Sequence, residues 1–577
     1  MIYGAVLAGG LGRRMERQTI PKQFMELGGV PILILTLRRF LECDCLDVVY
    51  VAVHPDWLAY ADELCKSNLS SGERARVRLV AGGRERLDSF LRIIEDVDEK
   101  RGLGDDDILI CHDAVRPFVR RKMIEDCVRA TEEYGFALTV IPMADTPHVA
   151  HEQDFLDGTL PRDGLYSGQT PSGFHAKTLK ALLEGLSEEE KCRSTGTTQL
   201  VLKAGHRIRI VEGHTSNFKI TTDVDLDLAE RVMLTEAKKR TVSILDCTLR
   251  DGGIVIDFNF GTERMCAIKD TLERSGVEYI ECGYIDEKKG SPAGRTCFDS
   301  EKAIEQTLLA DGKKPGVTYL AMIDYATFDP ERLGERTPSG IDGIRLAFHK
   351  EDWRDAVAWG RAILRKGYQL CIQPMVTARY TSEEYRELIE TCNEELEDAT
   401  AFYIADTFGQ LNRETLLERM RLADALVSPK MKLGLHAHNN RQMANSNALA
   451  FLANPAQHDL MVDASIAGMG KGAGNVCTEL LASALNREGK HYDTTALYES
   501  IHDYFSPQQR LTPWGYSLDY YLSSVYSCTP SYIKIFKADE RVTPSVLVEL
   551  LETMPEEKKA RCDRTFAAAY LKNYFTR

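Results

Sequence analysis

Short apolar runs of strand length alternate with helical patterns from residue 1 to residue 240. The apolar runs lie at 3–7, 48–53, 77–80 and 107–111, and the helical patterns lie at 38–41, 89–95 and 121–134. This alternation predicts a Rossmann-like α/β domain with a parallel sheet. Ligands of such sheets bind beyond the carboxyl ends of the strands, so we expect the chemistry of this region there.

From residue 242 the alternation starts again. Its strand-length segments lie at 242–247, 277–283, 317–323, 343–348, 369–375, 401–405, 432–435 and 460–466. The helical patterns between them include 264–274, 353–365, 382–396 and 413–426. Eight strand–helix units in about 230 residues are what a (β/α)8 barrel, or TIM barrel, requires, and its reactive groups should follow the strand ends.

The same patterns predict three domains. A helical pattern at 223–239 closes the first, and no Gly/Ser-rich or Pro-rich linker follows it, so we expect domains at 1–238 and 241–490 that are joined closely. The remaining segment, 491–577, carries aromatic and apolar residues at helical spacing. It predicts a helical C-terminal extension packed on the barrel; a dimer face and a cover over the barrel pocket are the alternatives.

Composition and charge narrow the class of protein. A chain of 577 residues is too long for one hydrophobic core, and 44% hydrophobic with 28% charged residues is typical of soluble globular proteins. The net charge of -15 argues against a nucleic-acid-binding surface. No apolar run is long enough for a bilayer, no basic-then-apolar leader is present, and the 15 cysteines lack paired spacing. We therefore expect a cytoplasmic protein with reduced thiols and no nucleic-acid or membrane partner. We also expect a homodimer.

The first predicted strand ends in a glycine-rich loop followed by basic residues. The strand end and loop contain Leu7, Ala8, Gly9, Gly10 and Gly12. Glycines turn tightly and present bare N–H groups to phosphate oxygens, and Arg14 and Lys22 bring positive charge beside them. The arrangement suits a nucleoside triphosphate attacked at its α-phosphate, where the transition state concentrates negative charge. The alternative is an ordinary strand-to-helix turn with a solvated basic face.

A second pair of glycines follows another strand. Gly82 and Gly83 come after the run at 77–80 and lead into a helical pattern that begins at Ser89. The N–H groups at this helix start are suited to an anion or to the edge of a base. This loop is therefore a second candidate for nucleotide contact.

The strand at 107–111 delivers a carboxylate and a guanidinium. Asp113 and Ala114 follow the strand directly, and Arg116 comes two residues later. Asp113 is a natural Mg²⁺ ligand at such a position, with a helix N-cap as the alternative. Arg116 could fix a substrate phosphate or pair with a surface carboxylate.

Six motifs occur in order over about 230 residues. They are Ala8-Gly9-Gly10-x-Gly-Arg-Arg-Met, Pro21-Lys22-Gln23, Gly82-Gly83 through Ser89, His112-Asp113-Ala114-Val115-Arg116-Pro117, Gln169-Thr170-Pro171 and Asn217-Phe218-Lys219. Together they resemble the methylerythritol-phosphate and ribitol-phosphate cytidylyltransferases. The resemblance implies Mg²⁺-dependent transfer of a cytidylyl group from CTP to a phosphorylated alcohol, which gives a CDP-linked product and pyrophosphate.

The resemblance also implies roles for individual residues. Arg14 and Lys22 would stabilise the charge that develops on the α-phosphate, and Arg162 with Lys219 would hold the phosphate of the second substrate. The remaining binding residues would be Asp113 for the metal, Gly82 and Ser89 for cytosine, and Arg116, Thr146 and Thr170 for the second substrate.

Three segments depart from the methylerythritol branch. Asp145-Thr146 is followed by Pro147-His148 rather than Ile-Lys, and Gly196-Thr197-Thr198-Gln199 replaces a segment that usually contains Asp. Gly168-Gln169-Thr170-Pro171 leans toward the ribitol-phosphate branch. We therefore expect a small acceptor such as ribitol 5-phosphate, or a phosphonate, without fixing which.

Metal-type ligands follow three strands of the predicted barrel. Asp251 follows the first strand, His436 and His438 lie on the seventh, and Asn475 ends a glycine-rich loop after the eighth. Histidines two residues apart on an extended segment point to the same side. A mixed set of nitrogen and oxygen ligands suits Mn²⁺, Mg²⁺, Co²⁺ or Zn²⁺, although a His-x-His pair alone is a weak signal.

Asp246 through Gly252, His436-x-His438 and Gly474-Asn475 together resemble the metal-dependent pyruvate-type aldolases and lyases, including hydroxymethylglutaryl-CoA lyase and, more closely, 4-hydroxy-2-oxovalerate aldolase. The resemblance implies that the metal ligands are Asp251, His436, His438 and Asn475. It implies Arg250 as the cation that stabilises an enolate, and a keto acid as substrate. A bound divalent metal would polarise that keto acid.

One residue departs from the aldolase pattern at the point of chemistry. The hydroxyoxovalerate aldolases usually have a catalytic histidine three residues after the ligand Asp, where this chain has Ile254. A tyrosine such as Tyr284 is a candidate for the missing acid or base. Glu281 and Asp406 also end strands, and we expect structural hydrogen bonding from both.

The sequence therefore predicts a bifunctional enzyme. Its first activity is cytidylyl transfer, and its second is a divalent-metal aldolase or lyase reaction on a keto acid. The first alternative keeps the cytidylyltransferase and treats the barrel as an inactive scaffold or dimerisation module. The second alternative is a sensor that binds a CDP metabolite without turnover.

Overall fold

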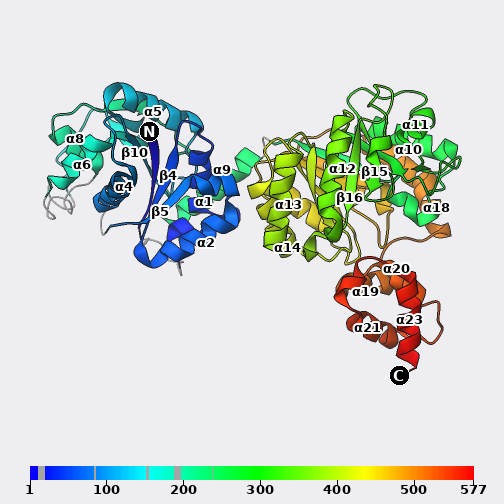
Figure 1. Ribbon diagram of the computed structural model, residues 1–577. Coiled ribbons are helices and arrows are strands. Elements are labelled where there is room, and N and C mark those ends of the chain that lie inside the picture. Colours follow the sequence, from blue (N-terminus) through cyan, green and yellow to red (C-terminus); the bar gives the residue numbers. More distant parts are fainter. Residues whose placement is uncertain (11–19, 84–85, 151–154, 187–195, 238–239, 577) are drawn as a thin grey trace. The chain divides into compact units, whose positions relative to one another are not determined.

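The chain divides into two compact units, Met1–Thr235 and Glu236–Arg577, in a computed structural model that describes residues 1–10, 20–83, 86–150, 155–186, 196–237 and 240–576 (Figure 1). Each unit has its own sheet and its own hydrophobic core, as the length of the chain requires. The domain limits at 238, 241 and 490 stay predictions.

The first unit is built on a seven-stranded sheet in the order β11–β7–β10–β6–β1–β4–β5. Its strands are β1 (Ile2–Ala8), β4 (Val48–Val53), β5 (Val77–Ala81), β6 (Ile108–Asp113), β7 (Phe136–Pro142), β10 (Tyr166–His175) and β11 (Arg209–Glu212). Strands β5, β4, β1 and β6 run parallel to one another. Strand β10 runs antiparallel to both β6 and β7, so the expectation of a wholly parallel sheet was wrong. The polar composition of β10 gave no apolar run by which the sequence could reveal it.

Helices cover both faces of this sheet because successive side chains of its strands point to opposite sides. Val6 and Ala8 face one core, which is formed with α1 (Ile32–Leu41), α2 (Leu58–Asn68) and α5 (Arg121–Tyr134). Tyr3 and Ala5 face the other, which is formed with α4 (Arg86–Arg101), α6 (Ala176–Glu184) and α8 (Thr197–Lys203). The smaller elements are η1 (Lys22–Phe24), β2 (Glu26–Leu27), β3 (Val30–Pro31), η2 (Pro55–Trp57), α3 (Ser71–Ala75), β8 (His148–Val149), β9 (Gly158–Thr159) and the closing helix α9 (Asp223–Ala237).

The second unit contains the predicted barrel of eight parallel strands. They are β12 (Val242–Asp246), β13 (Tyr279–Ile285), β15 (Thr318–Asp324), β16 (Gly343–Phe348), β17 (Gln369–Pro374), β18 (Ala401–Asp406), β19 (Lys432–Ala437) and β20 (Leu460–Ala464). Pairing of β12 with both β20 and β13 closes the sheet, and β14 (Cys297–Phe298) adds a short strand to β13. The fold of both units therefore confirms the predicted fold class.

An outer layer of helices covers the barrel strands (Figure 1). It includes α10 (Thr262–Ser275), α11 (Glu301–Gln306), α12 (Trp353–Arg365), α13 (Ser382–Glu395), α14 (Arg413–Leu426), α15 (Ala444–Ala453) and α16 (Thr478–Arg487). Short 3-10 turns follow several strands, namely η3 (Gly252–Ile256), η4 (Pro330–Arg332), η5 (Lys350–Asp352), η6 (Thr377–Arg379) and η7 (Ile466–Gly468). Inside the barrel a separate small core contains Leu245, Leu320 and Tyr403.

The chain after the barrel is helical. It contains α17 (Thr494–Ser500), η8 (Ile501–Phe505), α18 (Ser506–Leu511), α19 (Leu518–Val525), α20 (Pro530–Phe536), α21 (Pro544–Thr553), α22 (Glu556–Lys559) and α23 (Arg564–Phe575). The helices from α19 onward share a core that includes Tyr532, Phe536 and Leu550. Trp514 Nε1 donates to Ala467 O at 3.0 Å, which ties the extension to the loop after β20. Among the described residues, no helix is both long enough and apolar enough to cross a bilayer.

Candidate active sites in the two units

In the first unit, the loops that follow β1 and β5 meet near Ser89 on α4. The Gly83 N–H donates to Ser89 Oγ at 3.2 Å. A Cβ on Gly82 would lie 3.1 Å from Ser89 Oγ, and a Cβ on Gly83 would lie 2.1 Å from Asp88 Cβ. A Cβ on Gly9 would lie 3.8 Å from the same serine oxygen. Gly83 therefore lets that loop approach α4 more closely than any side chain allows, and the approach at Gly82 is tight.

Gln23 holds the start of the glycine-rich loop. Its buried amide Nε2 donates to Ala8 O at 2.7 Å and to Gly10 O at 3.0 Å. Lys22 is next to it in η1. Sequence reasoning placed Gln23 in a motif but not in the site, because a side chain that binds backbone carbonyls has no signature of its own. The predicted residues Gly12 and Arg14 lie outside the described residues.

Asp113 ends β6 and gathers three cations. Arg86 pairs with its Oδ1, while Arg116 Nε and Lys219 Nζ each lie 3.2 Å from Oδ2. Burial raises the pKa of Asp113, but these three positive charges outweigh it and hold the pKa well below its usual range. The carboxylate is therefore ionised at neutral pH, and it holds three cations in place. Sequence reasoning missed Arg86, although it is part of the run after Gly83.

Buried polar groups fix Asp113 and Arg116 from behind. His112 Nε2 lies 3.0 Å from Arg116 O and therefore carries the proton, so His112 Nδ1 accepts from Thr170 Oγ1 at 2.9 Å. The same Thr170 hydroxyl oxygen accepts from the Asp113 N–H at 3.3 Å. Burial lowers the pKa of His112 to about 4, which keeps the ring neutral. Arg116 Nη1 also donates to Asn217 O at 2.7 Å. Thr170 is thus buried behind the site, and it positions Asp113.

The other predicted residues of this site lie in different surroundings. Ala114 is buried, and its N–H donates to Leu7 O at 3.0 Å, which aligns the ends of β6 and β1. Thr146 and Arg162 are exposed, and Arg162 Nη1 donates to Ala144 O at 2.8 Å. No direct contact between described side chains joins Arg162 to Lys219. Their shared role at one phosphate stays a prediction.

The surroundings of Asp113 limit what it could offer to magnesium. Three cations already face the carboxylate, and in the described part of the chain it belongs to no group of three metal-type ligands. An ion there would take most of its ligands from phosphate oxygens and water, as Mg²⁺ commonly does. Magnesium at Asp113 therefore stays a prediction that depends on bound nucleotide.

In the second unit, the predicted metal ligands come together at the carboxyl end of the barrel. The ligand atoms of Asp251, His436 and His438 all lie within 4.8 Å of one another, and all three residues are buried. Asn475 Nδ2 donates to Asp251 Oδ2 at 2.8 Å. The Oδ1 of Asn475 is buried and has no hydrogen-bond partner among the described residues. These nitrogen and oxygen donors fit a divalent metal, and a buried amide oxygen without a partner is what a fourth ligand would provide.

Both histidines are oriented by a second contact. His436 Nδ1 lies 2.8 Å from Asp463 Oδ2, and His438 Nδ1 lies 3.1 Å from Lys471 O. An acceptor at Nδ1 places the proton there and leaves the Nε2 lone pair for a metal. Burial lowers the pKa of His438 to about 3, so this ring is neutral, as a metal ligand must be.

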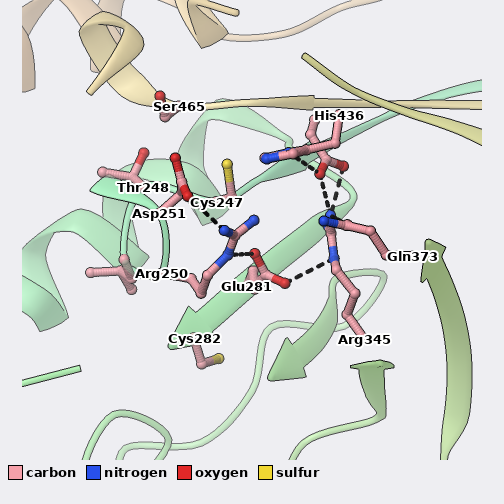
Figure 2. Close-up of polar contacts among 12 residues, drawn as sticks. Cys247, Thr248, Arg250, Asp251, Glu281, Cys282, Arg345, Gln373, His436 and Ser465 are labelled. Atoms are coloured by element: carbon pink, nitrogen blue, oxygen red, sulfur yellow. Dashed lines mark hydrogen bonds and ion pairs between the residues drawn. The ribbon is translucent and has the colours of Figure 1, made fainter. Parts of the chain in front are cut away.

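A buried chain of charges links these groups across the barrel interior, as Figure 2 shows for part of it. Arg250 Nη1 lies 2.7 Å from Asp251 Oδ1, and Arg250 Nε lies 2.6 Å from Glu281 Oε2. Glu281 Oε1 lies 2.9 Å from Nε of Arg345, a fully buried side chain. Arg345 in turn pairs with Asp463. The expected structural role of Glu281 agrees with its place between two arginines.

Arg250 keeps one donor available. Its Nη2 is buried and has no hydrogen-bond partner in the described part of the chain. Its guanidinium lies 5.8 Å from the ring centre of Tyr284.

Asp406 has a structural role. Its carboxylate accepts from the backbone N–H groups of Gln410 at 2.8 Å and Leu411 at 3.1 Å, and it therefore orders the loop after β18. Ile254 lies in η3.

The loop at Gly470 requires a residue without a side chain. A Cβ there would lie 2.3 Å from Asn475 Nδ2 and 2.6 Å from Asp251 Oδ2. We expect Gly470→Ala to lower the affinity for Mn²⁺ about 10–100-fold, the usual range for a disturbed outer shell, as measured by calorimetric titration. Gly72→Ala is the control because its added methyl meets nothing within 4 Å. Equal affinity of the two variants would contradict this reading.

The two folds and the two clusters define a fused protein, with a nucleotidyltransferase-type domain followed by a TIM-barrel domain. Residues 2–235 match the family described as IspD: 2-C-methyl-D-erythritol 4-phosphate cytidylyltransferase. Residues 351–503 match the family described as HMGL-like. The chain therefore joins an IspD-like cytidylyltransferase domain at its N-terminus to an HMGL-like TIM-barrel domain, which confirms both resemblances.

Solved structures from three organisms are similar to parts of the chain. A 2-C-methyl-D-erythritol 4-phosphate cytidylyltransferase from Thermus thermophilus has 27% identity, with 40% of this chain and 96% of that chain covered and a TM-score of 0.30. A 4-diphosphocytidyl-2C-methyl-D-erythritol synthase from Anaerococcus prevotii has 24% identity, with 40% and 95% covered and a TM-score of 0.35. The N-terminal domain of a proposed aldolase from Bacteroides vulgatus has 22% identity, with 53% and 99% covered and a TM-score of 0.47.

Proposed function

We propose that the first unit transfers a cytidylyl group from CTP to the phosphate or phosphonate oxygen of a small polyol-like acceptor such as ribitol 5-phosphate. The observation that carries the proposal is the group of three cations around Asp113, at the same strand edge as the glycine loops. An acceptor oxygen would attack the α-phosphorus, the bond to the leaving oxygen would break, and pyrophosphate would depart. Positive charge held in place before the reaction stabilises that transition state more than the ground state.

The chain's own residues divide this work. Lys22 and Arg14 are proposed to stabilise the α-phosphate, and Lys219 the phosphate of the acceptor. Asp113 holds Arg86 and Lys219 by ion pairs, so these cations need little reorganisation when phosphates arrive. Magnesium, when bound, would add positive charge at the phosphates.

We expect Lys219→Ala to lower the rate of pyrophosphate release about 10²–10³-fold, the usual loss for one preorganised charge-stabilising group. The measurement uses the full chain with CTP, Mg²⁺ and a panel of phosphorylated polyols and phosphonates. Lys177→Ala is the control. That exposed lysine lies on α6 and pairs with Asp105, which precedes β6, whereas Asp113 ends β6. Silence of the wild type with every acceptor, or full activity of Lys219→Ala, would contradict the proposal.

For the second unit we propose a metal-dependent reaction that makes or breaks a C–C bond beside a keto acid. The group of Asp251, His436 and His438, with Asn475 beside it, supports this proposal. A divalent metal held there would polarise the keto group. The unpartnered Arg250 Nη2 would donate to the enolate oxygen that develops when the C–C bond breaks.

The scaffold alternative for the barrel rests on Ile254, which stands in place of the expected histidine. The described residues around the metal ligands favour an active barrel instead. A buried guanidinium donor without a partner among the described residues costs stability, and a scaffold gives no reason to keep it. A scaffold also gives no reason for Gly470 to lie against Asp251 and Asn475. Metal removal distinguishes the two readings.

A further inference from the structure

Asp324 points into the mouth of the barrel. Along β15, Tyr319, Ala321 and Ile323 pack in the core shared with the outer helices, whereas Leu320 lies in the small core inside the barrel. Side chains of a strand alternate, so Asp324 points to the same side as Leu320. As the last residue of β15, it lies at the carboxyl end, where TIM barrels place their reactive groups.

One oxygen of the Asp324 carboxylate has no hydrogen-bond partner among the described residues. Its Oδ1 is shielded from solvent and receives no hydrogen bond from any described residue. Burial raises the pKa of Asp324, and the charges of Arg250 and Lys471 only partly offset that rise. A buried carboxylate oxygen without a donor is costly for stability and points to a ligand or a proton as its partner.

Several other acidic groups near this end already have partners. Asp251 and Glu281 each pair with Arg250, Asp463 pairs with Arg345, and Asp406 accepts backbone N–H groups. Burial, with Asp324 nearby, raises the pKa of Tyr284 well above its usual value, so this phenol keeps its proton at neutral pH and cannot act as a base. These contacts favour a carboxylate over the tyrosine as the acid or base of this site.

We propose that Asp324 is the proton-transfer residue of the barrel reaction, the role for which the chain lacks a histidine at Ile254. The inference rests on the barrel activity proposed above. The substrate in the cleavage direction is a 4-hydroxy-2-keto acid, with carbons numbered from its carboxyl carbon. Asp324 takes the proton of the C4 hydroxyl, the C3–C4 bond breaks, and C4 becomes a carbonyl carbon. The electron pair of the broken bond enters the enolate of the keto acid, and Asp324 returns the proton to C3.

The test follows exchange of the C3 hydrogens of pyruvate in D₂O by NMR, with the Mn²⁺-loaded full chain. Exchange isolates the proton transfer at C3 and needs no knowledge of the aldehyde partner. We expect Asp324→Asn to lower the exchange rate about 10²–10⁴-fold, the usual contribution of a positioned base. Bound Mn²⁺, measured for each variant, should stay at the wild-type level. Asp324→Glu should retain part of the rate, and added formate should raise the rate of Asp324→Ala.

Asp329→Asn is the matched control. Asp329 is exposed and accepts the Glu331 N–H at 3.0 Å as the cap of η4, a task that asparagine also performs. Its exchange rate should equal that of the wild type. The role of Asp324 would be overturned if Asp324→Asn exchanged hydrogen at the wild-type rate, or if its exchange rate fell together with its bound Mn²⁺. Either result would leave the proposed barrel activity standing. A wild type that binds Mn²⁺ but exchanges no hydrogen would overturn the proposed barrel activity, and the role of Asp324 with it.

Discussion

We expect His436→Ala to abolish metal binding by the barrel, and with it the C–C bond reaction, while cytidylyl transfer by the first unit continues. His436 is one of three buried ligands whose donor atoms lie within 4.8 Å of one another. Loss of a mere outer-shell partner usually costs 10–100-fold in metal affinity, so loss of a ligand should cost at least roughly 10²-fold. Metal content after dialysis, a Mn²⁺ titration and assays of both activities measure the effect.

His491→Ala serves as the control, because His491 is exposed on the chain that follows α16. It should bind metal as the wild type does. If His436→Ala keeps its metal, the three residues are not the binding site. If the wild type carries no metal and catalyses no C–C bond reaction, and His436→Ala leaves cytidylyl transfer unchanged, the scaffold reading of the barrel is the better one.

The largest loss of stability should come from Arg345→Met. Arg345 lies between Glu281 and Asp463, and all three side chains are fully buried. The arginine therefore neutralises two carboxylates at once. Removing it leaves buried charge without compensation, which usually costs about 3–5 kcal/mol in the free energy of unfolding. Denaturant unfolding of the full chain should show this loss in the transition of the second unit, with the first unit unchanged.

Two variants sharpen this measurement. Arg354→Met removes an exposed arginine that pairs with Glu387 at 2.6 Å, and such a surface pair is worth about 0–1 kcal/mol. Adding Asp463→Asn to Arg345→Met removes one of the two uncompensated charges, so the double variant should recover part of the lost stability. A cost below about 1 kcal/mol for Arg345→Met would show that the three groups are not coupled as their contacts indicate.

Much of the two candidate sites could be predicted from local patterns. Several strand ends were visible because the apolar run stops at a glycine or a charged residue, and ligands of α/β folds gather at such ends. His436 and His438 were recognisable because residues two apart on a strand share a face. Gly82 and Gly83 were recognisable as a candidate nucleotide loop, although only the structure shows that Gly83 lies against Asp88.

Other residues gave no signal because their roles arise from contacts between distant segments. Arg86, at the start of α4, pairs with Asp113 at the end of β6, 27 residues away in sequence. Asp463 on β20 likewise contacts His436 on β19, 27 residues away. Strand β10 gave no apolar run because several of its buried side chains are polar, and Gln169 and Thr170 among them are held by hydrogen bonds. Asp324 looks like any aspartate that follows a strand until the partners of its neighbours are known.

The sequence by itself determined the two folds, their order and the residue types at each strand end, because hydrophobic periodicity and glycine positions are local properties of the chain. Only the tertiary structure decided which charges meet. Closure of the barrel brings Asp251 to the two histidines. The packing of its interior pairs Glu281 with two arginines and leaves Asp324 Oδ1 without a donor among the described residues. Pairing of buried charges depends on which strands become neighbours and on which way each side chain points. Neither property can be predicted from a single segment of the chain.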